Sequence, residues 1–164
     1  MPLIRRIVHP TDLSPASKNA LAWAIHLAKE NQAELLLIHV LTPPTPIFEA
    51  ESALRPQSES ALSALLKNIQ QENIPAKRLL LKGTNSISKQ ILRAARILRA
   101  DLIVMGTHGR SGISRLFTGS VASRIIARSH CPVLVVRGES GRASSSPRTW
   151  SQHDECNKKT ELIP

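Results

Sequence analysis

The chain has 164 residues, of which 41% are hydrophobic and 21% are charged, a composition typical of one globular domain with a sizeable core. No apolar run approaches the roughly 20 residues that a membrane-spanning helix needs, and Arg5 and Arg6 interrupt the first apolar run, unlike in a signal peptide. The two cysteines, Cys131 and Cys156, form no disulfide framework. We therefore expect a cytoplasmic protein without a membrane segment.

The net charge of +10 is the compositional outlier, and it is distributed unevenly. Residues 1–137 carry eighteen basic and eight acidic residues, whereas residues 138–164 carry four of each. An excess of this size favours anionic partners, which include nucleotides, nucleic acids and acidic proteins. The last segment is rich in Ser and Arg and poor in apolar residues. We predict one domain over residues 1–137 and a mostly disordered polar tail over residues 138–164.

Strands and helices are predicted to alternate along the domain. Short apolar runs predict strands at residues 3–9, 34–41, 77–82, 101–106 and 132–137. Segments rich in Ala and Leu, or with an apolar stripe, predict helices at residues 14–31, 58–72, 87–98 and 120–129. This alternation requires parallel pairing with right-handed crossovers. The predicted fold is therefore α/β: a five-stranded open, parallel, doubly wound sheet of strand order 3-2-1-4-5, Rossmann-like, with helices on both faces.

Two local signals bound the first helix and the segment after the second strand. Ser14 followed by Pro15 is typical of a helix start, with serine as the N-cap and proline in the first helical position. Several prolines follow the second strand, and they predict a loop from Pro43 to Gln57. The sequence leaves open whether this loop closes over a ligand as a lid.

The run from Met105 to Val121 holds the most specific pattern in the chain. Gly106 and Gly109 follow a buried strand, and Gly119-Ser120 opens the next helix. Glycines at a strand exit let the backbone approach a ligand closely. A helix start offers unpaired N–H groups and the positive end of the helix dipole. These features predict a phosphate-binding loop, and hence nucleotide binding.

The predicted topology brings a second distinctive loop to the same place. In the order 3-2-1-4-5, the connection reverses between the first and fourth strands, and ligands of open α/β sheets bind beyond the carboxyl ends of the strands at that point. The first strand ends in Pro10-Thr11-Asp12 and the fourth in Met105-Gly106. We therefore expect these two loops to face each other.

Five segments carry a family resemblance: Ile7–Ser14, Leu37–Val40, Asp101–Arg110, Gly119–Val121 and Cys131–Val136. Together they resemble the universal stress protein family over about residues 3–137. The spacing G-x2-G-x9-G-[ST], which marks the ATP-binding branch of that family, is intact here. The resemblance implies an ATP-binding stress-response protein that pairs as a homodimer through its last strand, residues 133–136.

The resemblance also implies a set of nucleotide-contacting residues: Pro10, Thr11, Asp12, Val40, Met105, Gly106, Gly109, Arg110, Gly119, Ser120 and Val121. Residues 10–12 are expected on the ribose and phosphate side, and the backbone of Val40 against the adenine. Met105 and Gly106 are expected beside the ribose, and the later residues around the phosphates, with Mg²⁺ held through those phosphates. AMP or a cyclic nucleotide stays open as the ligand.

Three histidines, His9, His39 and His108, follow or end strands on the same edge of the predicted sheet. Imidazoles suit zinc, copper or nickel. No cysteine or further carboxylate beyond Asp12 joins them in the pattern, so we favour a framework role and assign no metal site.

The sequence allows three functional hypotheses, which assign different roles to these residues. We favour a nucleotide-dependent switch or sensor with no catalytic residue, because the chain lacks a Walker lysine. A slow ATPase that uses Asp12 and His108 is one alternative. A basic module for nucleic acid or an acidic protein is the other, based on the row Lys89, Arg93 and Arg96. Only four aromatic residues and no tyrosine occur, which argues against nucleic acid.

Overall fold

The computed structural model describes residues 3–42, 48–82, 86–106 and 120–137. The strands are β1 (Arg6–Pro10), β2 (Glu34–Leu41), β3 (Ala76–Lys82), β4 (Leu102–Gly106) and β5 (Val133–Val136). The helices are α1 (Pro15–Asn31), α2 (Phe48–Gln71), α3 (Ile87–Ile97) and α4 (Ser120–Arg128). The segment 138–164, expected to form a tail, lies outside the described residues.

The five strands form one parallel sheet of order β3-β2-β1-β4-β5, which confirms the predicted fold class and strand order. β1 pairs with β2 over its whole length, from Arg6 opposite Glu34 to Pro10 opposite Ile38. β1 and β4 pair only at two positions, Ile7 opposite Leu102 and Val8 opposite Ile103. The shortest run of paired residues in the sheet therefore lies between β1 and β4, where the order of connection reverses.

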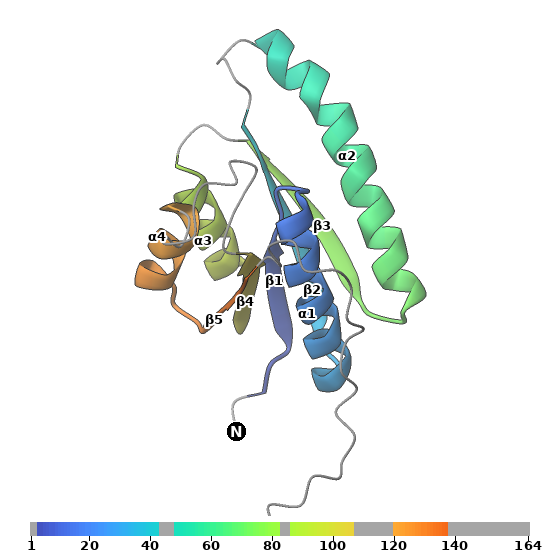
Figure 1. Ribbon diagram of the computed structural model, residues 1–164, viewed down its shortest axis with the longest axis vertical. Helices are drawn as coiled ribbons and strands as arrows, with labels where there is room; N and C mark the ends of the chain where they lie inside the picture. The colour runs from blue at the N-terminus through green and yellow to red at the C-terminus, as the bar shows by residue number, and fades with distance from the viewer. Residues whose placement is uncertain (1–2, 43–47, 83–85, 107–119, 138–164) are drawn as a thin grey trace, which may run out of the picture.

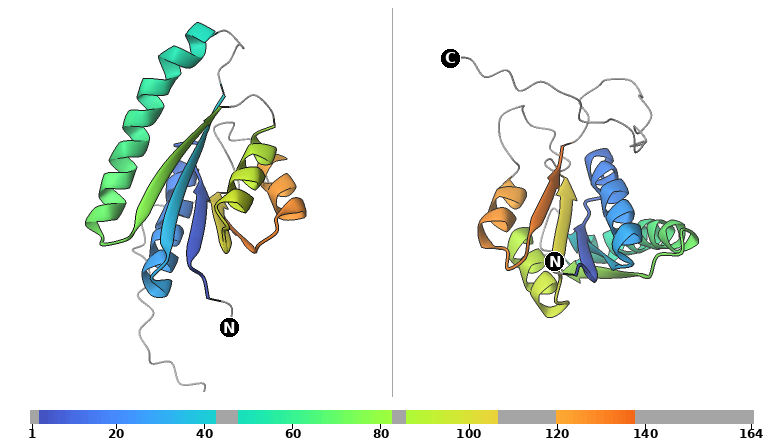
Figure 2. Two further views of the ribbon diagram at one scale, coloured as in Figure 1. Left: turned by 180° about the vertical axis from the view of Figure 1, so that it is seen from behind. Right: turned by 90° about the horizontal axis from the view of Figure 1, so that it is seen from below.

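Helices cover both faces of the sheet, as the predicted crossovers require (Figure 1, Figure 2). α1 and α2 bury their apolar stripes on one face, in a core that includes Leu21, Leu62 and Leu35. α3 and α4 pack on the other face, in a second core that includes Ile91 and Ile125. Because both faces are covered, β2 is buried along its length after Glu34 and reads as an uninterrupted apolar run apart from His39.

The second helix corrects the predicted loop. Residues 43–57 were expected to form a loop, but α2 begins at Phe48 and contains Pro56 in its interior; residues 43–47 lie outside the described part. A proline inside a helix removes one hydrogen bond, and the Ala, Glu and Leu residues around it have high helix propensity that favours continuation. Among the described residues, no helix, α2 included, is long and apolar enough to cross a membrane.

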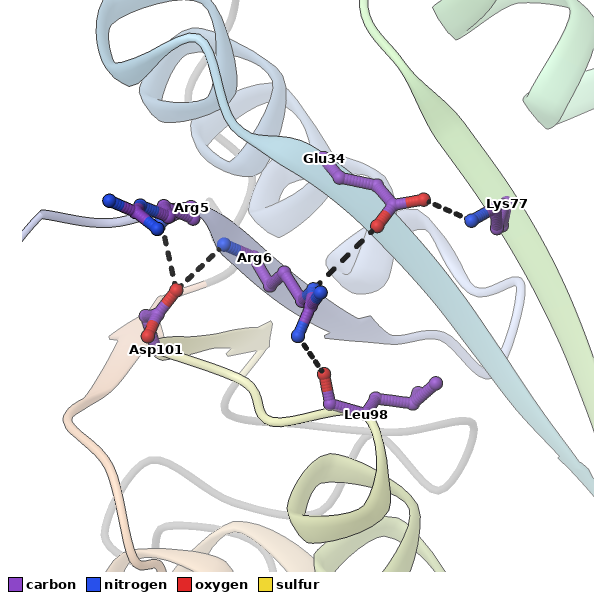
Figure 3. A network of polar contacts seen from close by, with 6 residues as sticks. All are labelled: Arg5, Arg6, Glu34, Lys77, Leu98 and Asp101. Atoms are coloured by element: carbon purple, nitrogen blue, oxygen red, sulfur yellow. Dashed lines mark hydrogen bonds and ion pairs between the residues drawn. The ribbon is translucent and has the colours of Figure 1, made fainter.

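A polar network ties the amino-terminal edge of the sheet together (Figure 3). A carboxylate oxygen of Asp101, just before β4, accepts hydrogen bonds from the backbone N–H groups of Arg5 at 2.8 Å and Arg6 at 2.9 Å. Glu34, at the start of β2, forms ion pairs with Arg6 at 3.9 Å and Lys77 at 2.7 Å. These contacts join β1 to β4 and β2 to β3 at the edge opposite the predicted ligand loops.

We predict that Asp101→Ala lowers the free energy of unfolding by about 1–2 kcal/mol, since it removes two charge-assisted hydrogen bonds that join β1 to β4. Urea denaturation followed by circular dichroism measures this change. Glu34→Gln, which affects only ion pairs with the partly exposed side chains of Arg6 and Lys77, should cost less than about 1 kcal/mol. An equal loss in both variants would contradict the central role of Asp101.

Candidate functional site

The candidate site lies at the carboxyl edge of the sheet, where β1 and β4 end. The β1–β4 pairing stops at Val8 and Ile103, and beyond these residues the two strands continue into the loops that the sequence singles out. β4 stays paired with β5 up to Gly106 opposite Val136. The structure therefore brings the β1–α1 loop and the end of β4 to the same edge, as expected for a switch point.

His9 connects β1 to β4 where their pairing ends. Its side chain is fully buried, and its Nδ1 lies 2.8 Å from the carbonyl oxygen of Val104. Because a carbonyl can only accept, Nδ1 carries the proton and donates. Burial lowers the pKa of His9 to about 4, although the bond to Val104 and the charge of Asp12 act in the opposite direction. The imidazole is therefore neutral at pH 7, and it replaces the missing backbone bonds between the strands.

Thr11 is the centre of a hydrogen-bonded loop. Its buried Oγ1 accepts from the backbone N–H of Leu13 at 3.1 Å and from the hydroxyl of Ser17 at 2.8 Å. The Ser17 hydroxyl also lies 3.5 Å from Nε2 of His9. Leu13 adopts a φ of 65°, in the left-handed region that a leucine rarely occupies. The Thr11 side chain thus holds the loop in a strained shape, and its predicted contact with a nucleotide stays a prediction.

Asp12 and Ser14 complete the loop and begin α1. Oδ1 of Asp12 accepts from the backbone N–H of Ser14 at 3.0 Å and from its hydroxyl at 2.6 Å. The Ser14 side chain in turn accepts from the N–H of Ser17 at 3.2 Å, which confirms the predicted N-cap with Pro15 in the first turn. Asp12 is half-buried at the carboxyl edge of the sheet. Its Oδ1 orients the start of α1 through the two hydrogen bonds with Ser14.

His39, the second histidine at this edge, also has a framework contact. It is buried near the end of β2, and its Nδ1 lies 2.7 Å from the carbonyl oxygen of Thr11, to which it donates. The backbone N–H of Thr11 donates to the carbonyl of Ile38 at 2.8 Å. Two contacts from β2 therefore fix the backbone of the β1–α1 loop.

The predicted adenine and ribose residues lie at the ends of neighbouring strands. Val40 on β2 and Met105 on β4 are buried in the core beneath α3 and α4, so backbone atoms are the groups they can offer. Gly106 is half-buried at the last position of β4. Val121, on the first turn of α4, packs partly against the same core.

The remaining predicted residues belong to the glycine-rich segment. Gly109, Arg110 and Gly119 lie outside the described residues, as does His108, and Ser120 is placed only as the first residue of α4. The first turn of α4 contains no acidic residue, so its positive dipole end is not neutralised by its own side chains.

The metal hypothesis gains no support in the described part of the chain, which contains no group of three His, Cys, Asp or Glu side chains suited to a metal ion. His9 and His39 instead donate to backbone carbonyls. Sequence reasoning missed Ser17, which links Thr11 to His9. The signal was present, because Ser17 shares the buried stripe of α1 with Leu21 and Ala24.

Comparisons with known proteins show which family this chain is similar to in sequence and in fold. The model of the universal stress protein family matches residues 3–137. A universal stress protein of Methanocaldococcus jannaschii is 37% identical over 143 residues, covering 82% of this chain and 83% of the relative. The universal stress protein UspA from Lactobacillus plantarum superposes with a TM-score of 0.72 at 22% identity, covering 84% of this chain and all of the other. One from Archaeoglobus fulgidus, solved in complex with dAMP, gives a TM-score of 0.62 at 21% identity and covers 82% and 98%.

We predict that the buried His9 makes the protein less stable in acid. In the unfolded state, the His9 side chain gains a proton as the pH falls below the ordinary histidine pKa of 6.5. In the folded state it gains a proton only near pH 4. The stability that neutral His9 contributes is therefore complete above pH 6.5. As the pH falls towards 4, the free energy of unfolding decreases by about 3 kcal/mol. Urea denaturation at several pH values measures it.

His9→Asn keeps a donor and removes the titrating group, so the loss of stability between pH 6.5 and 4 should shrink. His26→Asn, at an exposed position on α1, is the matched control and should keep the wild-type slope. An unchanged slope in His9→Asn would refute the assignment.

Proposed function

This chain belongs to the universal stress protein family, and we propose that it binds ATP at the carboxyl edge of its sheet and acts as a nucleotide-dependent switch or sensor. The observation that carries the proposal is the meeting of the β1–α1 loop and the end of β4 at the point where the strand order reverses. The intact G-x2-G-x9-G-[ST] spacing between Gly106 and Ser120 supports a phosphate-binding segment in between.

The described residues suit an adenine nucleotide in their chemistry. The ends of β2 and β4 offer backbone groups beside buried apolar side chains, which suits a flat base and a ribose. The start of α4, free of acidic residues, suits phosphates. Asp12, Thr11 and Pro10 would line the ribose and phosphate side, and Mg²⁺ would be held through the phosphates. The relative from Archaeoglobus fulgidus in complex with dAMP supports the adenine nucleotide class.

The hydrogen bonds of the β1–α1 loop support a switch rather than a catalyst. Its Thr11 hydroxyl, its backbone and the Asp12 carboxylate make hydrogen bonds within the fold, which suits a framework and binding role better than proton transfer. Gly109, Arg110, Gly119, Ser120 and Val121 would then hold the phosphates. Nucleotide contacts with this second segment would distinguish the bound from the free protein.

A homodimer through β5 is the assembly we propose. β5 ends the described sheet, so its outer edge has backbone groups available to another strand. Its four residues, Val-Leu-Val-Val, are half-buried in the single chain and have no charged side chain that would oppose pairing.

We predict that Gly119→Val weakens ATP binding more than about a hundredfold, because a branched side chain would occupy the space of a phosphate. Calorimetric titration with Mg-ATP, AMP and cyclic AMP measures the affinity and identifies the preferred ligand. Gly119 lies outside the described residues, so this variant tests the sequence prediction directly.

Gly83→Val is the matched control, because Gly83 follows the edge strand β3 and not a switch-point strand. It should retain the wild-type affinity. A folded Gly119→Val protein that still binds ATP normally would contradict the site, as would a wild-type protein that binds none of the three nucleotides.

We predict a mass in solution twice the 18.0 kDa of the chain, reduced to the monomer by Val135→Lys. A lysine there places charge at the outer strand of the proposed interface. Analytical ultracentrifugation measures both masses. Leu79→Lys, on the opposite edge strand β3, should leave the dimer intact. Dissociation by Leu79→Lys and not by Val135→Lys would place the interface on the β3 edge of the sheet and would contradict the proposed dimer.

A further inference from the structure

The helices on the two faces of the sheet differ in charge. On α3, Lys89, Arg93 and Arg96 are exposed, and on α4 Arg124 and Arg128 are exposed. Neither of these helices contains Asp or Glu. α1 and α2, on the other face, hold four acidic and four basic residues. We call the five exposed basic residues of α3 and α4 the basic face; the two helices pack side by side (Figure 1, Figure 2).

Within the described residues, no ion pair neutralises the basic face. The ion pairs found there lie elsewhere, among them Lys29 with Glu72 and Arg55 with Glu59. Asp101 is the one acidic residue between Lys82 and Arg137, and its carboxylate accepts from backbone N–H groups at the amino-terminal edge. Within the described residues, the positive charge of this layer is therefore not neutralised by an ion pair.

Helix stability does not account for this arrangement. Lys89 and Arg93 are four residues apart, as are Arg124 and Arg128, and like charges at this spacing cost a few tenths of a kcal/mol per pair. Lys89 also lies in the first turn of α3, where the helix dipole disfavours a cation. Only Arg96 and Arg128, in the last turns of their helices, are favoured by the dipole. Helix stability therefore does not explain Lys89, Arg93 or Arg124.

Two exposed isoleucines on the same helices indicate the chemical class of the partner. Ile97 on α3 is 69% exposed and Ile126 on α4 is 50% exposed. Protein interfaces combine arginine with apolar side chains and are poor in lysine, and the basic face has four arginines and one lysine. A phosphate backbone would leave the isoleucines uncovered, and neither helix carries an aromatic side chain for base stacking.

We propose that the α3–α4 surface docks a protein partner through an acidic amphipathic segment, in which carboxylates alternate with apolar side chains. Carboxylates of the segment pair with guanidinium groups such as that of Arg93, and its apolar side chains cover Ile97 and Ile126. The docking surface shares α4 with the proposed nucleotide site but uses other residues of that helix, and it does not depend on the proposed function.

A displayed library of random peptides, selected on the full chain, tests the proposal. The charge-reversed variant Arg93→Glu/Arg124→Glu serves for counter-selection. We expect enriched peptides that contain both Asp or Glu and large apolar residues. A synthetic peptide of the enriched sequence should bind the variant at least about tenfold more weakly than wild type, as expected when interface arginines are lost. Circular dichroism confirms that the variant is folded, and Arg93→Gln/Arg124→Gln replaces it if it is not.

Lys18→Glu/Lys67→Glu is the matched control, because it changes the net charge equally at exposed positions on α1 and α2. It should leave peptide affinity within about twofold, whereas Ile97→Ser/Ile126→Ser should weaken it. Equal weakening by both charge reversals would overturn the proposal, as would a library without acidic enrichment. Tighter binding of duplex DNA or of phosphatidylglycerol vesicles, insensitive to Ile97→Ser/Ile126→Ser, would overturn it in favour of a phosphate surface.

Discussion

The hydrogen bond from His9 to the carbonyl of Val104 is the interaction on which the candidate site depends. The backbone pairing of β1 with β4 ends at Val8 and Ile103, because the two strands lead to crossovers on opposite sides of the sheet. The hydrogen bond of the buried imidazole joins β1 to β4 one residue beyond the last backbone pair, and it holds the two strand ends together. Ser17 packs against His9 and donates to Thr11, so buried polar contacts join the end of β1 to the β1–α1 loop.

The two edges of the sheet are stabilised by different chemistry. At the amino-terminal edge, the half-buried carboxylates of Asp101 and Glu34 contact groups at the surface, where water screens the charges. At the carboxyl edge, His9 and His39 use neutral imidazoles in a buried environment, where a hydrogen bond is strong and an unpaired polar group is costly. In the described residues, the predicted ligand edge therefore relies on buried neutral groups, and the β1–α1 loop there includes Leu13 with its left-handed φ of 65°.

The sequence sufficed to predict the sheet, but it did not predict the start of α2 or the hydrogen-bond partners of the buried histidines. Apolar runs such as Glu34–Leu41 predicted β2 with its observed bounds, and the helix-strand alternation predicted the strand order. The start of α2 could not be predicted, because Pro56 is a helix breaker by propensity and its neighbours outweigh it. The carboxyl-edge positions of residues 10–12 and Met105 follow from topology. The partners of His9 and His39 do not, since they depend on the separation of strands that are distant in sequence.

The one-sided charge of the helical layers gives the described part of the molecule an electric dipole moment directed across its sheet. In the field of any polyanion, such a molecule rotates before contact until α3 and α4 lead and α1 and α2 trail. The carboxyl edge lies between the two layers, at right angles to this direction (Figure 2). A partner held by the leading layer therefore approaches the described domain across a face of the sheet, and not along the carboxyl ends of its strands.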